Sequence, residues 1–309
     1  MPLALPAENA SADLQPKPVV SFATFWAGRR VSAYEAACMA SFVRHDYRYV
    51  VYTYDDIENL PPGVERADAS DVADPGDMKR FIIRGTPNLT HFSDLFRYRL
   101  LQRTDHVWVD TDMMLLRPVP VPFSYLLALE DTRTLNNAIM RLERGSPELI
   151  ELIERTEQLR DRELAWGATG PQLLTRIFRG KHLYRQAPAE RFFPIHYDDF
   201  WKMFLPEFSE QCEALSLNAS TVHLWNNRIV MLGVWKRYAP PIGSFLWNRF
   251  QEIGVTEMFE AAYPADVMRN MVYNWRARCE GTEIEFGRWL RRAWPSAQLT
   301  FRRRLNLPV

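Results

Sequence analysis

Residues 92–118 read FSDLFRYRLLQRTDHVWVDTDMMLLRP, and this stretch decides the fold class. Its first part predicts a helix over 91–103, because four apolar side chains recur at the spacing of one helical face: Phe92, Leu95, Phe96 and Leu100. Thr90 or Ser93 is expected to cap this helix. Residues 106–109 then form a compact apolar strand that runs directly into Asp110-Thr111-Asp112. A helix followed by a buried strand with a polar end is typical of an α/β sheet.

The segments on either side of this stretch repeat the alternation of strands and helices. Residues 19–26 predict a buried strand, 32–44 a helix with a capping box of Ser32 and Glu35, and 47–54 a second strand. Residues 59–76 are rich in Pro, Asp and Gly and predict an irregular connection that holds a short strand. Downstream we expect a strand over 125–129, a helix that opens at Ser146-Pro147, a helix over 169–178 and a strand over 221–225.

These elements predict an α/β fold with a central, mostly parallel sheet flanked by helices. We expect a loose lead-in over residues 1–17, one α/β domain over 18–254, and a helical, basic C-terminal appendage over 255–309.

The composition excludes several classes of protein. Hydrophobic residues make up 47% of the 309 residues, so the chain can bury a core and is not disordered as a whole. The 38 basic residues balance 38 acidic ones, so no overall field attracts nucleic acid. Cys38, Cys212 and Cys279 are too far apart for a disulfide framework or a zinc motif, which suits a reducing compartment. The chain starts without a basic export signal and holds no apolar run of about 20 residues, so we expect a cytoplasmic protein.

The strongest chemical signal is the pair Asp110 and Asp112 at the end of the strand over 106–109. Open α/β sheets place ligands at the carboxyl ends of their strands. Carboxylate oxygens suit Mg²⁺ or Mn²⁺, which phosphate oxygens also bind. Two neighbouring carboxylates repel each other unless a cation offsets their charge, which favours a metal site. The alternative is an ordinary pair of aspartates that caps the following turn.

Asp94 and Arg97 lie three residues apart and therefore on one face of the predicted helix. In isolation this pair is an ion pair on the protein surface, worth a few tenths of a kcal/mol. With the Asp-x-Asp loop close behind it, Asp94 could instead bind a ribose or base, and Arg97 a phosphate or a sugar hydroxyl.

His223 ends an apolar strand far downstream of Asp112. A lone histidine is usually a satisfied polar group near the core, but an imidazole can also complete a Mn²⁺ shell begun by carboxylates. Two further segments, Asn136-Asn137-Ala138-Ile139 and residues 166–171, are polar joins between apolar segments. Such joins can be structural turns, or they can hydrogen-bond a ligand rich in hydroxyl groups.

Together and in this order, these motifs resemble the Asp-x-Asp glycosyltransferases with the GT-A fold, and above all the α-retaining group of family 32. That group includes bacterial capsule and lipopolysaccharide sugar transferases and α-1,4-galactosyltransferases. The likeness runs from about residue 19 to 235 and rests on these segments: SFATFW (21–26) with the SxxE helix (32–35), FSDLFRYRLL (92–101), HVWVDTDMMLLRP (106–118), LNNAIM (135–140), WGATGPQLLT (166–175) and HLWN (223–226). The chain departs from a common pattern of the family where Ala27 and Gly28 follow Trp26 directly and Arg29-Arg30 come next.

The resemblance implies a set of site residues. The donor-binding residues would be Phe25, Trp26, Asp94, Arg97, Asp110, Thr111, Asn137, Thr169 and Gly170, the catalytic residues Asp110, Asp112, Arg97 and Asn137, and the metal ligands Asp110, Asp112 and His223. Phe25 and Trp26 would hold the nucleotide base, and Asn137 the donor sugar. Asp112 would bind the metal, Mn²⁺ or Mg²⁺, together with the diphosphate.

The function that the resemblance implies is metal-dependent, retaining transfer of a hexose. The donor would be a nucleoside diphosphate sugar, and the resemblance to the family favours UDP. The acceptor would be a saccharide or glycolipid, which no motif identifies. A front-face route would need no protein nucleophile, which leaves Glu130 as a fallback candidate only.

Two competing functions remain. Haloacid-dehalogenase-like phosphatases also use an Asp-x-Asp after a strand, but their motif opens the domain and they need a later acidic pair on a strand. Asp198-Asp199 is the available pair, and it lacks the apolar strand. A non-catalytic protein that binds nucleotide-sugars would keep the fold and lose turnover.

The C-terminal end gathers basic and aromatic residues. Its members are Arg288, Trp289, Arg291, Arg292, Trp294, Phe301, Arg302, Arg303 and Arg304. They predict either a helix that packs on the domain or a peripheral contact with an anionic membrane, at the inner membrane face.

Overall fold

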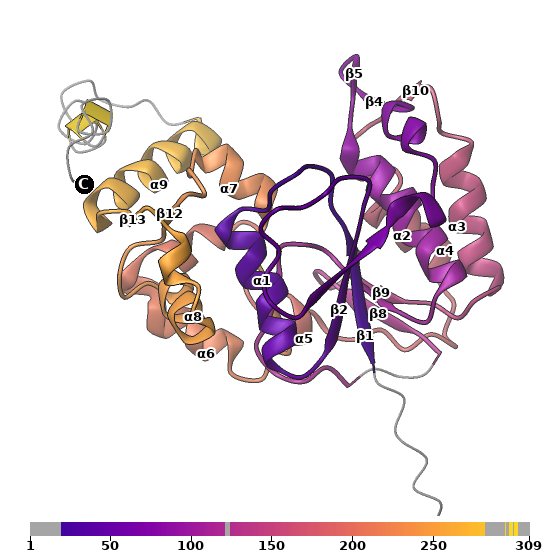
Figure 1. Cartoon of the computed structure of the whole chain (residues 1–309), viewed down its shortest axis with the longest axis horizontal. Coiled ribbons are helices and arrows are strands. Elements are labelled where there is room, and N and C mark those ends of the chain that lie inside the picture. The colour runs from indigo at the N-terminus through magenta and orange to yellow at the C-terminus, as the bar shows by residue number, and fades with distance from the viewer. Residues whose placement is uncertain (1–19, 121–123, 282–293, 295–296, 299, 302–309) are drawn as a thin grey trace, which may run out of the picture.

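A six-stranded sheet forms the centre of the computed structural model, which describes residues 20–120, 124–281, 294, 297–298 and 300–301. Strand β9 runs antiparallel to both of its neighbours, and the remaining neighbouring pairs are parallel. In sheet order the strands are β3 (Val64–Asp68), β2 (Arg48–Thr53), β1 (Ser21–Phe25), β6 (Val107–Val109), β9 (Leu135–Arg141) and β8 (Leu126–Leu129). The predicted α/β class with a mostly parallel central sheet is confirmed (Figure 1).

Alternation along the strands produces two cores, one on each face of the sheet. In β1, Phe22 belongs to the core that includes α1 (Ala33–Arg44), whereas Ala23 and Phe25 belong to the core that includes α2 (Leu89–Arg103). Trp108 in β6 points to the α2 side, and its neighbours Val107 and Val109 point to the α1 side. Successive side chains of a strand face opposite ways, so a strand that is buried on both faces reads as a continuous apolar run.

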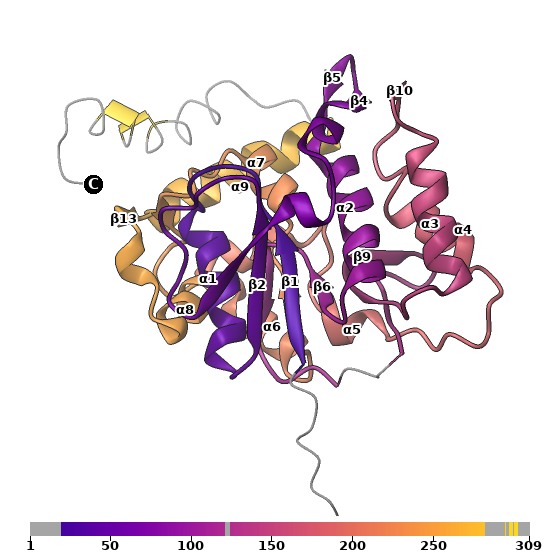
Figure 2. The ribbon, with the colours of Figure 1, turned by 45° about the vertical axis from the view of Figure 1, so that its right-hand side comes forward.

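The helices divide between these two faces (Figures 1 and 2). One face of the central sheet carries α2, α3 (Pro147–Glu157) and α4 (Pro171–Phe178). The other face carries α1, α5 (Ala189–Phe192), α6 (Ser209–Ser216), α7 (Asn226–Leu232), α8 (Phe245–Ile253) and α9 (Ala265–Glu280). Short 3-10 turns complete the helical elements: η1 (Ala69–Asp71), η2 (Pro75–Lys79), η3 (Phe200–Phe204), η4 (Pro206–Phe208) and η5 (Thr256–Met258).

Three small sheets lie outside the central one. The first joins β10 (Arg162–Glu163), β4 (Phe81–Ile83) and β5 (Thr86–Pro87), and another pairs β12 (Tyr238–Ala239) with β13 (Ala261–Ala262). The third pairs β7 (Met113–Leu115) with β11 (Thr221–His223) in antiparallel register, with Met113 opposite His223. This last pairing brings a late segment of the chain to the Asp-x-Asp loop.

Several local predictions are confirmed and others need correction. Ser32 caps α1 and Ser146 caps α3, as predicted. Helix α2 starts earlier than predicted: its cap is Asn88, whose Oδ1 accepts the Thr90 N–H at 2.9 Å, so neither Thr90 nor Ser93 caps it.

A second correction concerns residues 136–139, which form part of the buried strand β9 and not a polar join. Polar side chains are tolerated there because they find partners. Asn136 Nδ2 donates to Glu130 Oε2 at 2.6 Å, and Asn137 Nδ2 donates to Asp94 Oδ1 at 2.8 Å.

The C-terminal part of the described chain packs on the α1 side of the sheet. Val267, Met268 and Trp275 of α9 share one core with α1 and α8. The predicted boundary between residues 254 and 255 stays a prediction. Residues 1–17 and the arginines at 288, 291, 292 and 302–304 lie outside the described residues, and so does Trp289. Within the part of the chain that the structure describes, no helix is long and apolar enough to cross a bilayer.

Candidate active site

Asp110 and Asp112 follow β6 at the edge where the parallel strands end. Strand β9 runs the other way and therefore begins at this edge, where its Ala138 carbonyl accepts the Asp110 N–H at 2.7 Å. The Trp108 indole Nε1 donates to Asp110 Oδ1 at 2.7 Å. The Asp110 side chain stays 27% exposed, so the second carboxylate oxygen is available to a ligand.

The pairing of β7 with β11 sets His223 beside Asp112. The Leu224 N–H donates to the Asp112 carbonyl at 2.9 Å, and His223 Nε2 lies 3.1 Å from Asp112 Oδ2. The chain then turns back through Trp225, which adopts a left-handed conformation with φ 59° and ψ 59°. This turn aims the Asn226 N–H at Asp112 Oδ2, at 2.8 Å. A left-handed non-glycine residue costs about 1–2 kcal/mol, so the surrounding packing must hold it.

These three side chains fit a divalent cation. One ligand atom each from Asp110, Asp112 and His223 lies within 4.8 Å of the others. Two carboxylates and an imidazole form a donor set that suits Mn²⁺. The three predicted ligands thus lie together, and their role as metal ligands stays a prediction.

The pKa values of Asp110, Asp112 and His223 depend on the same contacts. Burial opposes the charge on Asp112, but the adjoining His223 and the Asn226 N–H outweigh burial and lower the pKa of Asp112 to about 2. Burial and the nearby Asp112 raise the pKa of Asp110 against the influence of Arg97. Burial would lower the pKa of His223, yet the Asp112 carboxylate raises it. The site therefore concentrates negative charge, which the imidazole, Arg97 and the more distant Lys236 offset in part.

Arg97 links the Asp-x-Asp loop to a second, buried acid. Its guanidinium lies 3.0 Å from Asp110 Oδ1 and 3.3 Å from Asp94 Oδ1, donates to the Asn137 carbonyl, and stacks 4.8 Å from the Trp108 ring. Asp94 and Arg97 are each only 3% exposed. The alternative of an ion pair on the surface is therefore wrong. Burial opposes the charge on Asp94, but Arg97 and three hydrogen bonds lower its pKa.

Thr169 and Gly170 contact Asp94 from outside the cleft. Thr169 is fully buried, and its hydroxyl donates to Asp94 Oδ2 at 2.7 Å. Gly170 precedes α4 and packs so closely that a Cβ would lie 2.9 Å from Asp94 Oδ2 and 3.0 Å from Asn137 Nδ2. Thr169 thus contacts Asp94, Gly170 packs against Asp94 and Asn137, and neither residue lines the open cleft.

Replacing Gly170 by alanine is expected to displace the Asp94 and Asn137 side chains, because the new methyl group has no space. We expect a loss of about 1–3 kcal/mol in the free energy of unfolding and weaker binding of the predicted nucleotide-sugar donor. Urea denaturation and calorimetric titration with UDP-galactose measure the two effects. Gly145→Ala serves as the control for binding. Its φ of 73° costs the alanine some stability, but its Cβ would meet nothing within 4 Å, so donor binding should not change. Unchanged binding in Gly170→Ala would contradict the close contact.

The site opens into a cleft of about 710 Å³. The predicted residues that line it are Phe25, Trp26, Asp94, Arg97, Asp110, Thr111, Asp112, Glu130, Asn137 and His223. The two aromatic candidates for the base differ in access. Phe25 is 8% exposed and packs against Phe92 and Phe96, whereas Trp26 is only partly buried. Trp26 is thus the more accessible of the two.

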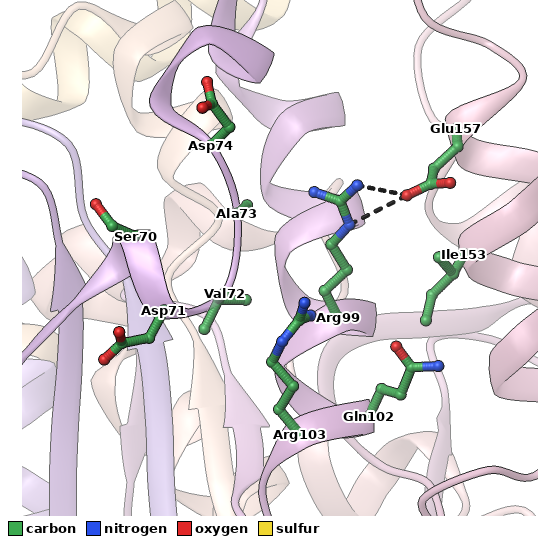
Figure 3. A pocket seen from close by; sticks show the side chains of 10 residues that line it. All are labelled: Ser70, Asp71, Val72, Ala73, Asp74, Arg99, Gln102, Arg103, Ile153 and Glu157. Carbon is green, nitrogen blue, oxygen red and sulfur yellow. Dashed lines mark hydrogen bonds and ion pairs between the residues drawn. The ribbon is translucent and has the colours of Figure 1, made fainter.

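A second cavity, of about 370 Å³, lies at the C-terminal half of α2 (Figure 3). Arg99 lines this cavity and donates hydrogen bonds to Glu157. Gln102 and Arg103 extend from the same helix. None of the predicted site residues lines this cavity. The candidate site is therefore the larger cleft.

Sequence reasoning did not identify Asn226 and Glu35 as site residues. Besides its bond to Asp112, Asn226 donates through Nδ2 to Glu35 Oε1 at 2.9 Å. Glu35 is 1% exposed and forms an ion pair with Lys236. The segments HLWN and SxxE contained both residues, but only as marks of resemblance or of a helix start.

The phosphatase alternative requires an acidic pair on a strand. Asp198 and Asp199 instead lie in a turn before η3, and Asp198 lies 3.6 Å from Arg228. Neither residue belongs to the cluster around Asp112.

Comparison with known proteins agrees with the geometry. Residues 158–231 match the family described as the alpha 1,4-glycosyltransferase conserved region. The matched segment contains Thr169, Gly170, His223 and Asn226, whereas Asp94, Arg97 and the Asp-x-Asp pair precede it. The predicted relationship to glycosyltransferases of the α-1,4 type is confirmed.

Part of the chain is similar to curated relatives. Lactosylceramide 4-alpha-galactosyltransferase of Rattus norvegicus is 30% identical over 149 residues, which are 44% of this chain and 41% of that protein. Alpha-1,4-N-acetylglucosaminyltransferase of Homo sapiens is 26% identical over 183 residues, 50% of this chain and 52% of that protein. The chain thus matches less than two thirds of either relative. A solved structure titled WbbM bifunctional glycosyltransferase, apo form, has a TM-score of 0.44 and 12% identity, and the match covers 76% of this chain and 49% of that chain.

Proposed function

We propose that the chain is a metal-dependent, retaining glycosyltransferase that moves a hexose from a nucleoside diphosphate sugar to a saccharide or glycolipid hydroxyl. The observation that carries the proposal is the convergence of Asp110, Asp112 and His223 within 4.8 Å in the cleft that Asp94, Arg97 and Asn137 also line. A divalent cation held by the three ligands would offset the charge that the leaving diphosphate gathers.

The residues of the chain would orient the donor and hold its charge. Arg97, fixed between Asp94 and Asp110, supplies a buried positive charge near the diphosphate. Asp94 would accept hydrogen bonds from sugar hydroxyls, and Asn137 would donate hydrogen bonds to them. The hydroxyl of Thr169 holds Asp94 in place. In a front-face route the bond between the anomeric carbon and the diphosphate oxygen breaks with its electron pair on that oxygen. The acceptor hydroxyl forms the new bond on the same face and passes its proton to the diphosphate, so Glu130 is not required as a nucleophile.

The relatives narrow the substrates that we propose. Their names specify α-1,4 transfer of galactose or N-acetylglucosamine, and the rat protein is named for lactosylceramide. We therefore infer a hexose or hexosamine donor. UDP is the nucleotide that we propose for the donor, by resemblance to the family. An aromatic contact with Trp26 accommodates any base, so it does not select uracil over guanine.

Chelation tests the metal in this proposal. We expect transfer from UDP-galactose or UDP-N-acetylglucosamine with Mn²⁺ present, and loss of almost all transfer with EDTA that added Mn²⁺ restores. Release of nucleotide, measured with a panel of donors, reports the activity. Calorimetric titration with UDP and GDP in the presence of Mn²⁺ compares the bases, and tighter binding of GDP would overturn the preference for UDP.

Three outcomes would contradict the proposed function. Transfer that continues unchanged in EDTA would remove the role of the metal. Release of phosphate from p-nitrophenyl phosphate, without sugar transfer, would favour the phosphatase alternative. Binding of UDP without any turnover would favour the non-catalytic alternative.

A further inference from the structure

One tryptophan of the cleft has no place in the donor site. Trp166 lines the cleft and is 55% exposed, and Leu89, at the first turn of α2, lines the same cleft and is 48% exposed. The remaining tryptophans of the cleft are largely buried: Trp108 is 1% and Trp225 6% exposed, and Trp26 is partly buried. A large apolar surface at a cleft wall favours a ligand that covers it.

The backbone holds Trp166 in a defined position relative to the donor residues. The Gln172 side chain donates to the Trp166 carbonyl at 3.0 Å, and the carbonyl of Gly167 accepts the N–H groups of both Gly170 and Gln172 at 3.2 Å. Gly167 has φ 76°, which closes this turn. Gly170 in turn packs against Asp94 and Asn137. The turn therefore holds the backbone of Trp166 four residues from Gly170, which packs against the side chains that would bind the donor sugar.

Polar groups line the same cleft as Trp166 and Leu89. Asn227 and Arg228 of α7 line it, and Arg228 stacks 4.8 Å from the ring of Tyr197, which lines it as well. Helices α7 and α4 lie on opposite sides of β1 (Figures 1 and 2). A flat apolar surface in one cleft with hydrogen-bond donors and acceptors matches a pyranose ring, which has a face of C–H groups and an edge of hydroxyls.

We propose that Trp166 is the platform on which a ring of the acceptor saccharide stacks. This inference rests on the proposed function, because it assigns the acceptor side of the same site. Asp94, Arg97 and Asn137 would bind the donor sugar, and Trp26 would contact the donor base. Trp166, together with Asn227 and Arg228 of α7, is then available to bind the second substrate. Trp166 is a binding residue and takes no part in proton or group transfer.

The test compares acceptor-dependent and acceptor-independent turnover in Trp166→Ala. Nucleotide release from the UDP-sugar is measured with Mn²⁺, first with water as the acceptor and then with p-nitrophenyl β-lactoside, β-galactoside and β-N-acetylglucosaminide. We expect the KM for the saccharide that the wild type uses best to rise about 10-fold or more. Hydrolysis of the donor and the Kd for UDP should stay within about twofold, since neither involves the platform. Trp166→Phe should recover most of the affinity because it restores an aromatic face.

Trp235→Ala is the matched control. Trp235 is 39% exposed and lies outside the residues that line the cleft, so its loss should leave the saccharide KM unchanged. An unchanged KM in Trp166→Ala, or no stimulation of the wild type by any of the three saccharides, would overturn the inference. A weaker Kd for UDP in Trp166→Ala would instead place the nucleotide base on the indole and also overturn it. Failure of the wild type to hydrolyse or bind any donor would reject the proposed function itself, which keeps the two outcomes separate.

Discussion

Replacing Asp112 by asparagine is expected to lower the rate of sugar transfer by about 10³-fold or more, because the variant loses the charge that would hold the cation and diphosphate. The amide keeps the shape of the side chain, and its oxygen can still accept the Asn226 N–H that now reaches Asp112 Oδ2 at 2.8 Å. The fold should therefore survive. Titration with Mn²⁺ should show a large loss of affinity, while thermal unfolding stays cooperative.

The matched control for this prediction is Asp105→Asn. Asp105 lies just before β6, is 74% exposed at its side chain and pairs with Arg144, so the same chemical change should leave both Mn²⁺ affinity and transfer intact. Asp110→Asn should also be severe, since it removes the partner that Arg97 contacts at 3.0 Å. Near-native transfer by both Asp112→Asn and Asp110→Asn, with normal melting, would mean that the Asp-x-Asp loop is structural.

Replacing Arg97 by methionine is expected to lower the free energy of unfolding by about 3–5 kcal/mol, the range for breaking a buried ion pair. Methionine retains much of the apolar stem but leaves the Asp94 carboxylate, 3% exposed, without a cation. The Arg97 charge is also the first of the influences that lower the pKa of Asp94 against its burial. Urea denaturation at pH 7 measures the loss, and transfer should fall along with it.

An exposed pair of the same type provides the comparison. Arg48 bonds Glu65 through two nitrogens, but both side chains are about half exposed, at 51% and 49%. Arg48→Met should therefore cost only about 0–1 kcal/mol. The double variant Arg97→Met with Asp94→Asn should recover part of the stability, because it removes the unpaired charge. If Arg97→Met costs no more than Arg48→Met, the buried network is not a source of stability.

Signals that act over a few residues were predictable from the sequence. Ser32 and Ser146 lie one position before α1 and α3, and each accepts a hydrogen bond from the first turn of its helix. The strand before Asp110 was predicted because its apolar run is short and ends in two carboxylates. The cap of α2 was predicted wrongly, since Asn88, Thr90 and Ser93 can all cap a helix and only the path of the chain after β5 selects among them.

The exposure of side chains and the direction of strands were not predictable from the same local patterns. Phe25 and Trp26 are neighbours with equal claim to the nucleotide base, but alternation along β1 buries Phe25 among Phe92 and Phe96. Asn137 was expected in a loop, yet it lies in β9, where the reversed direction of the strand brings it to Asp94. Glu35 satisfies a capping pattern, and its contact with Asn226 depends on helices far apart in the sequence.

The sequence by itself determined the α/β class, the strand that carries Asp110 and Asp112, and the identity of the candidate ligands, because these depend on local periodicity and on the chemistry of single side chains. Only the tertiary structure decided that Asp94 and Arg97 are buried, that Thr169 and Gly170 support the site from behind, and that Trp166 remains exposed in the cleft. It also decided that His223 meets Asp112, through the register of β7 and β11. The physical reason is that burial and contact between distant segments arise from the packing of the whole chain, to which no local pattern is sensitive.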